Sequence, residues 1–314
     1  MCAVKNLWAK PGFISMPGGN QISIWGYAES LNASPIFPGP IIEGRVNETI
    51  QINLYNNLSE STSLIFPGQN MTPNPVKDVN GKFISYNTLV EPGQLGIYSF
   101  TAARPGIFLY ESGTASDKQV HMGLYGVIII RPDDFDVNNP EFRTAYGSGS
   151  NTEFDVECIL VLGEVDSDIH YKIVNNFPYS FIDYNPNYFI INGRAYPDSV
   201  NPEDNSSQPF TSRIITLPLQ RILVRCINSG YQNYNIRFDS MTPRIIAVDS
   251  YPLIELQTDK SFMKNTITIS PGESYELILQ APSSGKYVIY DRSYNHTVNQ
   301  GAYPGGIMTL MEVL

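Results

Sequence analysis

The stretch at residues 110–132 reads Y-E-S-G-T-A-S-D-K-Q-V-H-M-G-L-Y-G-V-I-I-I-R-P and indicates the fold class. Its polar loop separates two extended apolar runs, at residues 106–110 and 127–130. Short apolar runs that are bounded by turn residues are typical of buried β-strands. We therefore expect a strand on each side of this loop.

The rest of the chain repeats the pattern of short strands and tight turns. Alternating apolar runs occur at residues 22–27, 48–58 and 97–101. The 24 glycines and 23 prolines disfavour long helices, because both residues destabilise helix interiors. The sequence predicts an all-β fold.

The length of 314 residues is enough for two domains that each bury a core of their own. Residues 134–153 are acidic and rich in Gly and Ser, without any hydrophobic period, which is typical of a linker. We predict a first domain at residues 1–133, a linker at 134–153 and a second domain at 154–314.

Five further motifs follow one another along the chain. They are F-P-G-P-I-I-E-G at 37–44, Y-F-I-I-N-G-R-A-Y-P-D at 188–198, R-I-L-V-R-C-I-N-S-G at 221–230, I-I-A-V-D-S-Y-P-L at 245–253 and I-S-P-G-E-S-Y-E-L-I at 269–278. Together with residues 110–132 they resemble, in the same order, motifs of multicopper oxidases of the cupredoxin superfamily. The resemblance covers nearly the whole chain. It implies two cupredoxin-like Greek-key domains, each a β-sandwich or barrel, and copper as the cofactor of the family.

The residues that the family uses as copper ligands are replaced in this chain. By resemblance, Ser112 stands where some two-domain relatives carry the copper thiolate, Gln119 where they carry an imidazole, and Leu124 where they carry the axial methionine. Ile65 and Pro67 stand at two further histidine positions. Because blue copper sites need a thiolate and two imidazoles, the resemblance implies degenerate copper sites and no copper cofactor.

Four residues remain as weak candidates for holding a metal: Glu111, His121, Asp291 and His296. Residues 290–296 fit the family spacing H-C-H-x-x-x-H and keep only its last histidine. A surface or hydrogen-bonded imidazole is the simpler interpretation of both histidines. We also hypothesise that Arg292 forms a buried ion pair with Glu111 or Asp291 in place of a metal cluster.

Three functions are compatible with this pattern. The first is a non-catalytic protein that is retained for assembly or binding, and the Tyr- and Asn-rich segment 179–188 suits protein contacts. The second is an oxidoreductase or metal-binding enzyme that uses Glu111, His121 and Asp291 around a hard or borderline cation, or copper. The third is a subunit of a larger multicopper oxidase. We favour the first, and thus a protein that is not an enzyme.

Charge and hydropathy exclude several classes of partner. The net charge of -10 and the pI near 4.8 disfavour nucleic acid, and no apolar run reaches the roughly 20 residues of a membrane span. The odd count of cysteines argues against a disulfide framework: Cys158 and Cys226 are expected to be buried thiols, and Cys2 could form an intermolecular disulfide. The first twenty residues do not form a secretory signal, although the family resemblance implies an extracytoplasmic or cell-surface location.

Overall fold

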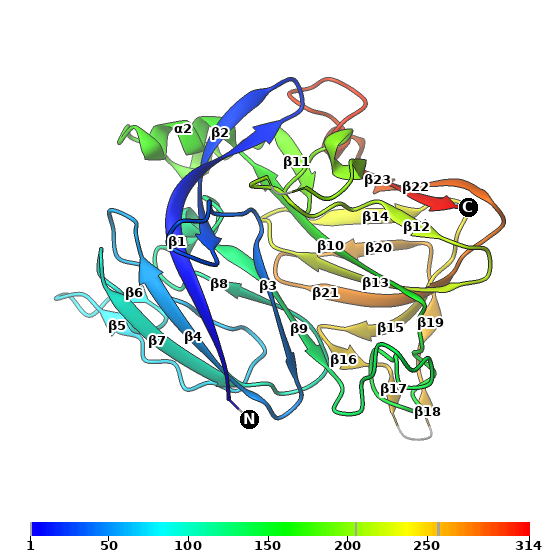
Figure 1. Cartoon of the computed structure of the whole chain (residues 1–314). Coiled ribbons are helices and arrows are strands. Elements are labelled where there is room, and N and C mark those ends of the chain that lie inside the picture. Colours follow the sequence, from blue (N-terminus) through cyan, green and yellow to red (C-terminus); the bar gives the residue numbers. More distant parts are fainter. Residues whose placement is uncertain (1, 205, 256–257) are drawn as a thin grey trace.

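β-strands make up nearly all regular structure in the computed structural model, which describes residues 2–204, 206–255 and 258–314. The strands form one sandwich from the N-terminal half of the chain and a second sandwich from the C-terminal half (Figure 1). The prediction of an all-β fold is confirmed.

The first sandwich stacks a four-stranded sheet on a three-stranded sheet. The four-stranded sheet has the order β2 (Asn20–Ala28), β1 (Cys2–Met16), β4 (Thr49–Asn56), β7 (Leu95–Thr101). The three-stranded sheet has the order β3 (Gly39–Arg45), β9 (Tyr125–Arg131), β8 (Gly106–Glu111). Alternate residues of β4, namely Ile50, Ile52 and Leu54, are buried between the two sheets. This burial explains the period of two in the sequence.

The second sandwich is built in the same way from larger sheets. Its first sheet has the order β11 (Tyr188–Ile191), β10 (Val156–Val165), β13 (Arg221–Asn228), β21 (Ser274–Gln280), β15 (Arg244–Val248), β16 (Tyr251–Pro252), with β19 (Phe262–Met263) also on β15. Its second sheet has the order β12 (Ile214–Thr216), β23 (Met308–Val313), β22 (Gly285–Asp291), β14 (Tyr234–Phe238), β20 (Thr266–Ile269). Apolar side chains of both sheets form the core between them.

A third apolar core joins the two sandwiches. Strand β9 is buried on both faces, since Ile128 and Ile130 point into the first sandwich while Val127 and Ile129 point toward the second. On the other side, Val161 of β10 contributes to the same shared core. Burial on both faces explains why residues 127–130 are continuously apolar instead of alternating.

The remaining elements are short. They are helices α1 (Ser116–Gln119) and α2 (Ser167–Val174), hairpins β5 (Val76–Lys77) with β6 (Phe83–Ser85) and β17 (Ile254–Glu255) with β18 (Thr258–Asp259), and single 3-10 turns at Phe181–Asp183, Asp198–Val200 and Tyr294–His296. The Asp166 carboxylate caps α2 by accepting from the backbone N–H groups of Asp168 and Ile169. Within the described residues, neither helix has the length and hydropathy to cross a membrane.

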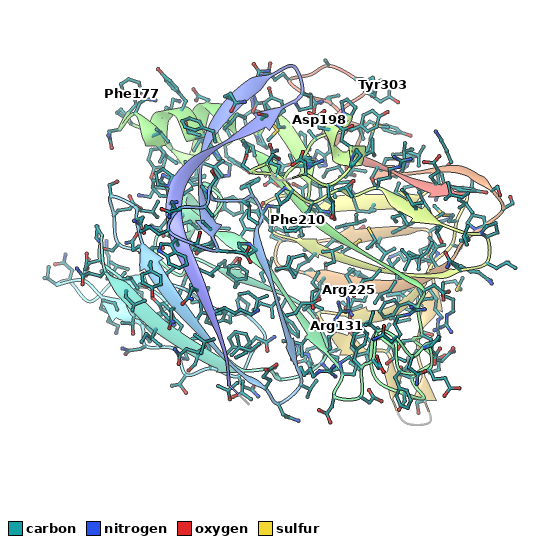
Figure 2. The ribbon with its side chains drawn as sticks, in the orientation of Figure 1. Arg131, Phe177, Asp198, Phe210, Arg225 and Tyr303 are labelled. Carbon is teal, nitrogen blue, oxygen red and sulfur yellow. The ribbon has the colours of Figure 1, made fainter. Side chains whose placement is uncertain are left out.

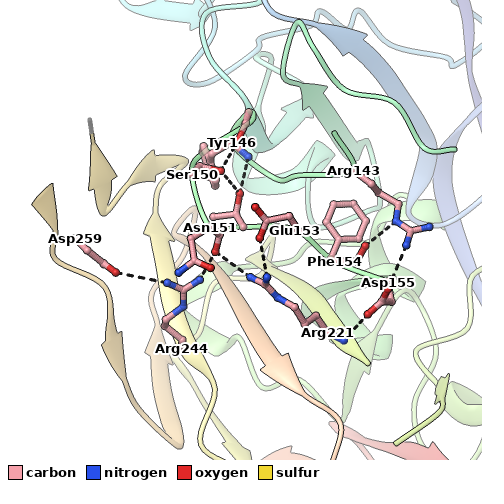
Figure 3. A network of polar contacts seen from close by, with 12 residues as sticks. Arg143, Tyr146, Ser150, Asn151, Glu153, Phe154, Asp155, Arg221, Arg244 and Asp259 are labelled. Atoms are coloured by element: carbon pink, nitrogen blue, oxygen red, sulfur yellow. Dashed lines mark hydrogen bonds and ion pairs between the residues drawn. The ribbon is translucent and has the colours of Figure 1, made fainter. Parts of the chain in front are cut away.

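The segment predicted as a linker contains no helix or strand, and it is held in place by polar contacts (Figure 3). The Asn151 carbonyl accepts from the guanidinium groups of Arg221 and Arg244, and Arg221 also pairs with Glu153 at 2.7 Å. Ala145 is buried beside residues of the second sandwich. The segment therefore packs against the second sandwich and is not a free tether.

Candidate functional site

Ser112 and Gln119, which the family resemblance aligns with a copper thiolate and an imidazole, meet in the first sandwich. Ser112 follows β8 and Gln119 ends α1, and the Ser112 Oγ lies 2.6 Å from the Gln119 Oε1. Thr62, in the loop after β4, donates to the same oxygen at 2.9 Å. All three side chains are fully buried. The loops after β4 and β8 thus bring Thr62, Ser112 and Gln119 together in one buried polar cluster.

The Gln119 amide uses its whole hydrogen-bonding capacity in this position. Its oxygen accepts from the Ser112 and Thr62 hydroxyls, while its Nε2 donates to the Glu60 carboxylate at 2.8 Å and to the Ser61 carbonyl at 2.9 Å. The Glu60 carboxylate also pairs with the ammonium group of Lys118 at 2.6 Å. Two acceptor sites and two donors are the full inventory of an amide, so none is free for a metal ion.

A second buried hydroxyl cluster adjoins the first. The hydroxyls of Ser63, Ser85 and Thr114 lie 2.8 to 3.0 Å from one another. The Ser85 hydroxyl also donates to the Asn87 carbonyl at 2.6 Å. Hydroxyl and amide oxygens are hard donors, and copper in blue sites requires a thiolate and imidazoles. The donor set at this position therefore does not fit copper.

The C-terminal motif holds an acid–imidazole pair. The Nδ1 of His296 lies 2.7 Å from the Oδ2 of Asp291, and both side chains are buried. The other carboxylate oxygen accepts from the backbone N–H groups of Ser293 and Asn235, at 2.7 and 3.2 Å. The His296 ring stacks on Phe189 with centroids 4.4 Å apart. This histidine is a packed, hydrogen-bonded core residue.

The hypothesis of an ion pair through Arg292 is wrong. Arg292 is exposed, and its guanidinium lies over the ring of Tyr294, 4.8 Å from the centroid. Asp291, the last residue of β22, points into the sandwich, and the next residue along an extended chain points to the opposite side. An acidic residue does pair with a base here, but that base is His296.

Glu111 and His121 lie at the boundary between the sandwiches. Burial raises the pKa of the Glu111 carboxyl to about 7. The His121 imidazole is 5% exposed and is surrounded by His170, Tyr184 and Tyr231, with ring centroids 4.7 to 5.9 Å away. Burial lowers the pKa of His121, and the neighbouring His170 lowers it further. In the described part of the chain, the His121 Nε2 has no hydrogen-bond partner.

These candidates do not converge on one point. Among the residues that the structure describes, no three His, Cys, Asp or Glu side chains are close enough to hold a metal ion together. Cys158 and Cys226 are buried free thiols, as predicted, and burial raises the pKa of Cys158 to about 12. The Cys2 side chain lies outside the part of the chain that the structure describes.

A line of five charged side chains crosses the same boundary and was not expected from the sequence. It runs from Glu43 through Arg131, Glu157 and Arg225 to Glu276, one residue from each of β3, β9, β10, β13 and β21. Arg131 and Arg225 lie close together between the two halves (Figure 2), and both donate to the same Glu157 oxygen at 2.7 Å. Burial alone would raise the pKa of the Glu157 carboxyl. The two guanidinium groups have the larger effect and lower this pKa to about 2.

Two stacked β-sandwiches that share an apolar boundary define a cupredoxin-like fold. A family model described as multicopper oxidase matches residues 14–134. The first sandwich therefore belongs to the multicopper oxidase family, and the chain as a whole is similar to its members.

Individual relatives agree with this assignment. The chain is 24% identical to L-ascorbate oxidase of Cucurbita maxima over 276 residues, which cover 80% of this chain and 43% of that protein. It therefore spans less than half the length of this relative. In solved structures, the multicopper oxidase mgLAC superposes with a TM-score of 0.78 at 18% identity, and the blue copper oxidase from Nitrosomonas europaea with a TM-score of 0.77 at 21% identity. Both superpositions cover 100% of this chain and 86% of the other.

Proposed function

We propose that this chain is a non-catalytic member of the multicopper oxidase family that holds no copper and serves in assembly or binding. The Gln119 side chain carries the proposal, because all its donors and acceptors are used by neighbouring groups at a position where relatives carry an imidazole. The hydroxyl of Ser112 in place of a thiolate supports it. So does the Asp291–His296 pair at the second position.

An exposed apolar patch supports the binding role. It lies on α2 and the turn that follows, and consists of Tyr171, Val174, Phe177, Tyr179 and Ile182. Figure 2 shows Phe177 at the outer margin of the molecule. Aromatic residues are enriched in protein interfaces, and a contiguous exposed patch marks an interaction site. Of the segment 179–188, only the first part contributes, because Tyr188 is buried in β11.

The test is metal analysis of the purified protein after expression with copper, combined with oxygen uptake in the presence of a reducing substrate. The blue copper oxidase from Nitrosomonas europaea, prepared in parallel, is the positive control. We expect copper well below one ion per chain and no oxygen uptake above the blank. Stoichiometric copper together with oxygen uptake would overturn the proposal.

A metal-dependent role is the second candidate function, because the His121 Nε2 is buried without a partner within the described chain. The same metal analysis tests this role across divalent cations, and a bound metal that is lost in His121→Ala would support it.

The location and the covalent state of the chain are part of the proposal. Family membership supports an extracytoplasmic or cell-surface location and a chain that works with protein partners or further copies, including as a subunit of a larger oxidase.

Electrophoresis with and without reductant tests whether Cys2 links two chains, with Cys2→Ser as the control variant.

A further inference from the structure

Strand β7 is an outer strand of the first sandwich. In the order β2-β1-β4-β7 it pairs with β4 on one side, from Thr49↔Thr101 to Tyr55↔Leu95 without a bulge. On its other side, the backbone N–H and C=O of Thr101 bond to Asn70. Elsewhere along that side, no strand of the described chain pairs with β7.

The direction of the free backbone groups follows from this contact. Thr101 bonds to Asn70 with both its N–H and its C=O, so both groups point away from β4. Backbone groups of an antiparallel strand alternate between its two edges with a period of two residues. The N–H and C=O groups of Ser99, Ile97 and Leu95 therefore also point away from β4. They form an edge that is ready to accept another strand.

This edge lacks the usual protection against such pairing. Natural sheets guard their edges with charged residues, proline or bulges. β7 reads L-G-I-Y-S-F-T, with no charge and no proline. Its outward side chains Leu95 and Ile97 are 47% and 64% exposed. An apolar edge strand without charge, proline or bulge is a site where a further strand can add to the sheet.

The outer face of the four-stranded sheet favours a second copy of the same chain as the partner of β7. The register of β1, β4 and β7 sets nine side chains on this outer face in three rows: Val4, Gln51, Ser99; Asn6, Asn53, Ile97; and Trp8, Tyr55, Leu95. None of the nine is charged, although the chain carries a net charge of -10. A two-fold contact brings the same surface together twice, so like charges would oppose it. This face avoids that repulsion.

We propose that β7 pairs antiparallel with β7 of a second copy across a two-fold axis, which joins the two four-stranded sheets into one continuous sheet. Pairing centred on Ile97 sets Ile97 against Ile97 and Leu95 against Ser99. The backbone groups at these positions, which point outward, then bond to each other. The inference rests on the proposed function, because it names the partner of an assembly protein.

The experiment is native mass by light scattering over a series of concentrations. The unmodified chain is expected at twice its 35.1 kDa. Ile97→Lys sets two ammonium groups against each other at the axis, and is expected at the mass of one chain. Ile215→Lys is the matched control, since Ile215 is 50% exposed on β12 of the second sandwich, and it is expected to stay dimeric. Circular dichroism and melting confirm that each variant folds.

Amide hydrogen exchange locates the contact. In the dimer, the amides of Ile97 and Ser99 are expected to exchange slowly, and in Ile97→Lys they are expected to exchange fast. A monomer at every concentration would overturn the inference, as would a dimer that survives Ile97→Lys or is lost in Ile215→Lys. Slow exchange of these amides in a monomer would overturn it too, because another segment or a foreign peptide would then cover the edge.

Copper analysis of the same samples separates this inference from the proposed function. A dimer with stoichiometric copper and oxygen uptake would refute the copper-free function and leave the edge contact standing. A copper-free monomer would refute the edge contact and leave the copper-free function standing.

Discussion

Arg225 and Glu276 face each other on adjacent strands β13 and β21, and both side chains are fully buried. Arg225 also donates to Glu157, and Glu157 accepts from Arg131 of the first sandwich. The pair therefore anchors a charged connection between the two halves. A buried charge that loses its partner is costly, since water cannot replace the lost interaction.

Removing one member of this pair is expected to destabilise the chain strongly. Arg225→Met leaves the Glu276 carboxylate buried without its partner, and the free energy of unfolding should fall by about 3–5 kcal/mol. Arg225→Met combined with Glu276→Leu removes both charges, and should recover most of that loss. Urea denaturation measures both values. If the double variant were as unstable as the single one, the cost would come from lost packing and not from the unpaired charge.

The Gln119 network makes a second stability prediction. Gln119→Leu leaves the hydroxyls of Ser112 and Thr62 without their shared acceptor in a buried position. Unsatisfied buried polar groups cost about 1–3 kcal/mol each, so we expect a loss of about 2–4 kcal/mol by urea denaturation. Gln280→Leu, at an exposed position on β21, is the control and should change stability little. Equal effects of the two substitutions would show that the network contributes nothing.

The contact of Ser112, Thr62 and Gln119 predicts that a copper site can be built at this position. In one variant with Thr62→His, Ser112→Cys, Gln119→His and Leu124→Met, a thiolate, two imidazoles and a thioether meet where the hydroxyls and the amide now lie. This is the donor set of a blue copper site. We expect one tightly bound copper ion and an intense blue colour, with no colour in the parent protein. A variant that folds but stays colourless with copper would mean that the loops have moved from the ligand positions.

The sequence predicted the strands around this site better than the hydrogen bonds within it. The family resemblance aligned Ser112 and Gln119 with two neighbouring ligand positions, and the two side chains do meet between the flanking strands β8 and β9. Thr62 was missed, since it reaches Gln119 across 57 residues of chain and no local pattern reports such a contact.

The C-terminal motif shows the limit of reasoning from charge alone. An arginine next to an aspartate suggested an ion pair, but strand alternation sends Arg292 to solvent and leaves Asp291 to the histidine five residues later. The charged line from Glu43 to Glu276 was unpredictable for a related reason. Its members come from five strands that lie far apart in the sequence, and no local pattern reports which charged residues of different strands will meet.

The Glu111 carboxyl makes a prediction for pH. Burial raises its pKa from 4.5 to about 7, so the folded chain holds this proton where the unfolded chain has released it. Relative to the ionised form, the protonated Glu111 carboxyl contributes to the free energy of unfolding. This contribution is fully present below about pH 4.5 and is lost as the pH rises through 7. A shift of this size corresponds to about 3 kcal/mol. Glu111→Gln cannot ionise, so its unfolding free energy should exceed that of the parent at pH 8 by up to this amount and match it near pH 4. Denaturation at both pH values measures the difference, with the exposed Glu29→Gln as the control. A difference between Glu111→Gln and the parent that stays the same at both pH values would show that this carboxyl titrates alike in the folded and unfolded chains.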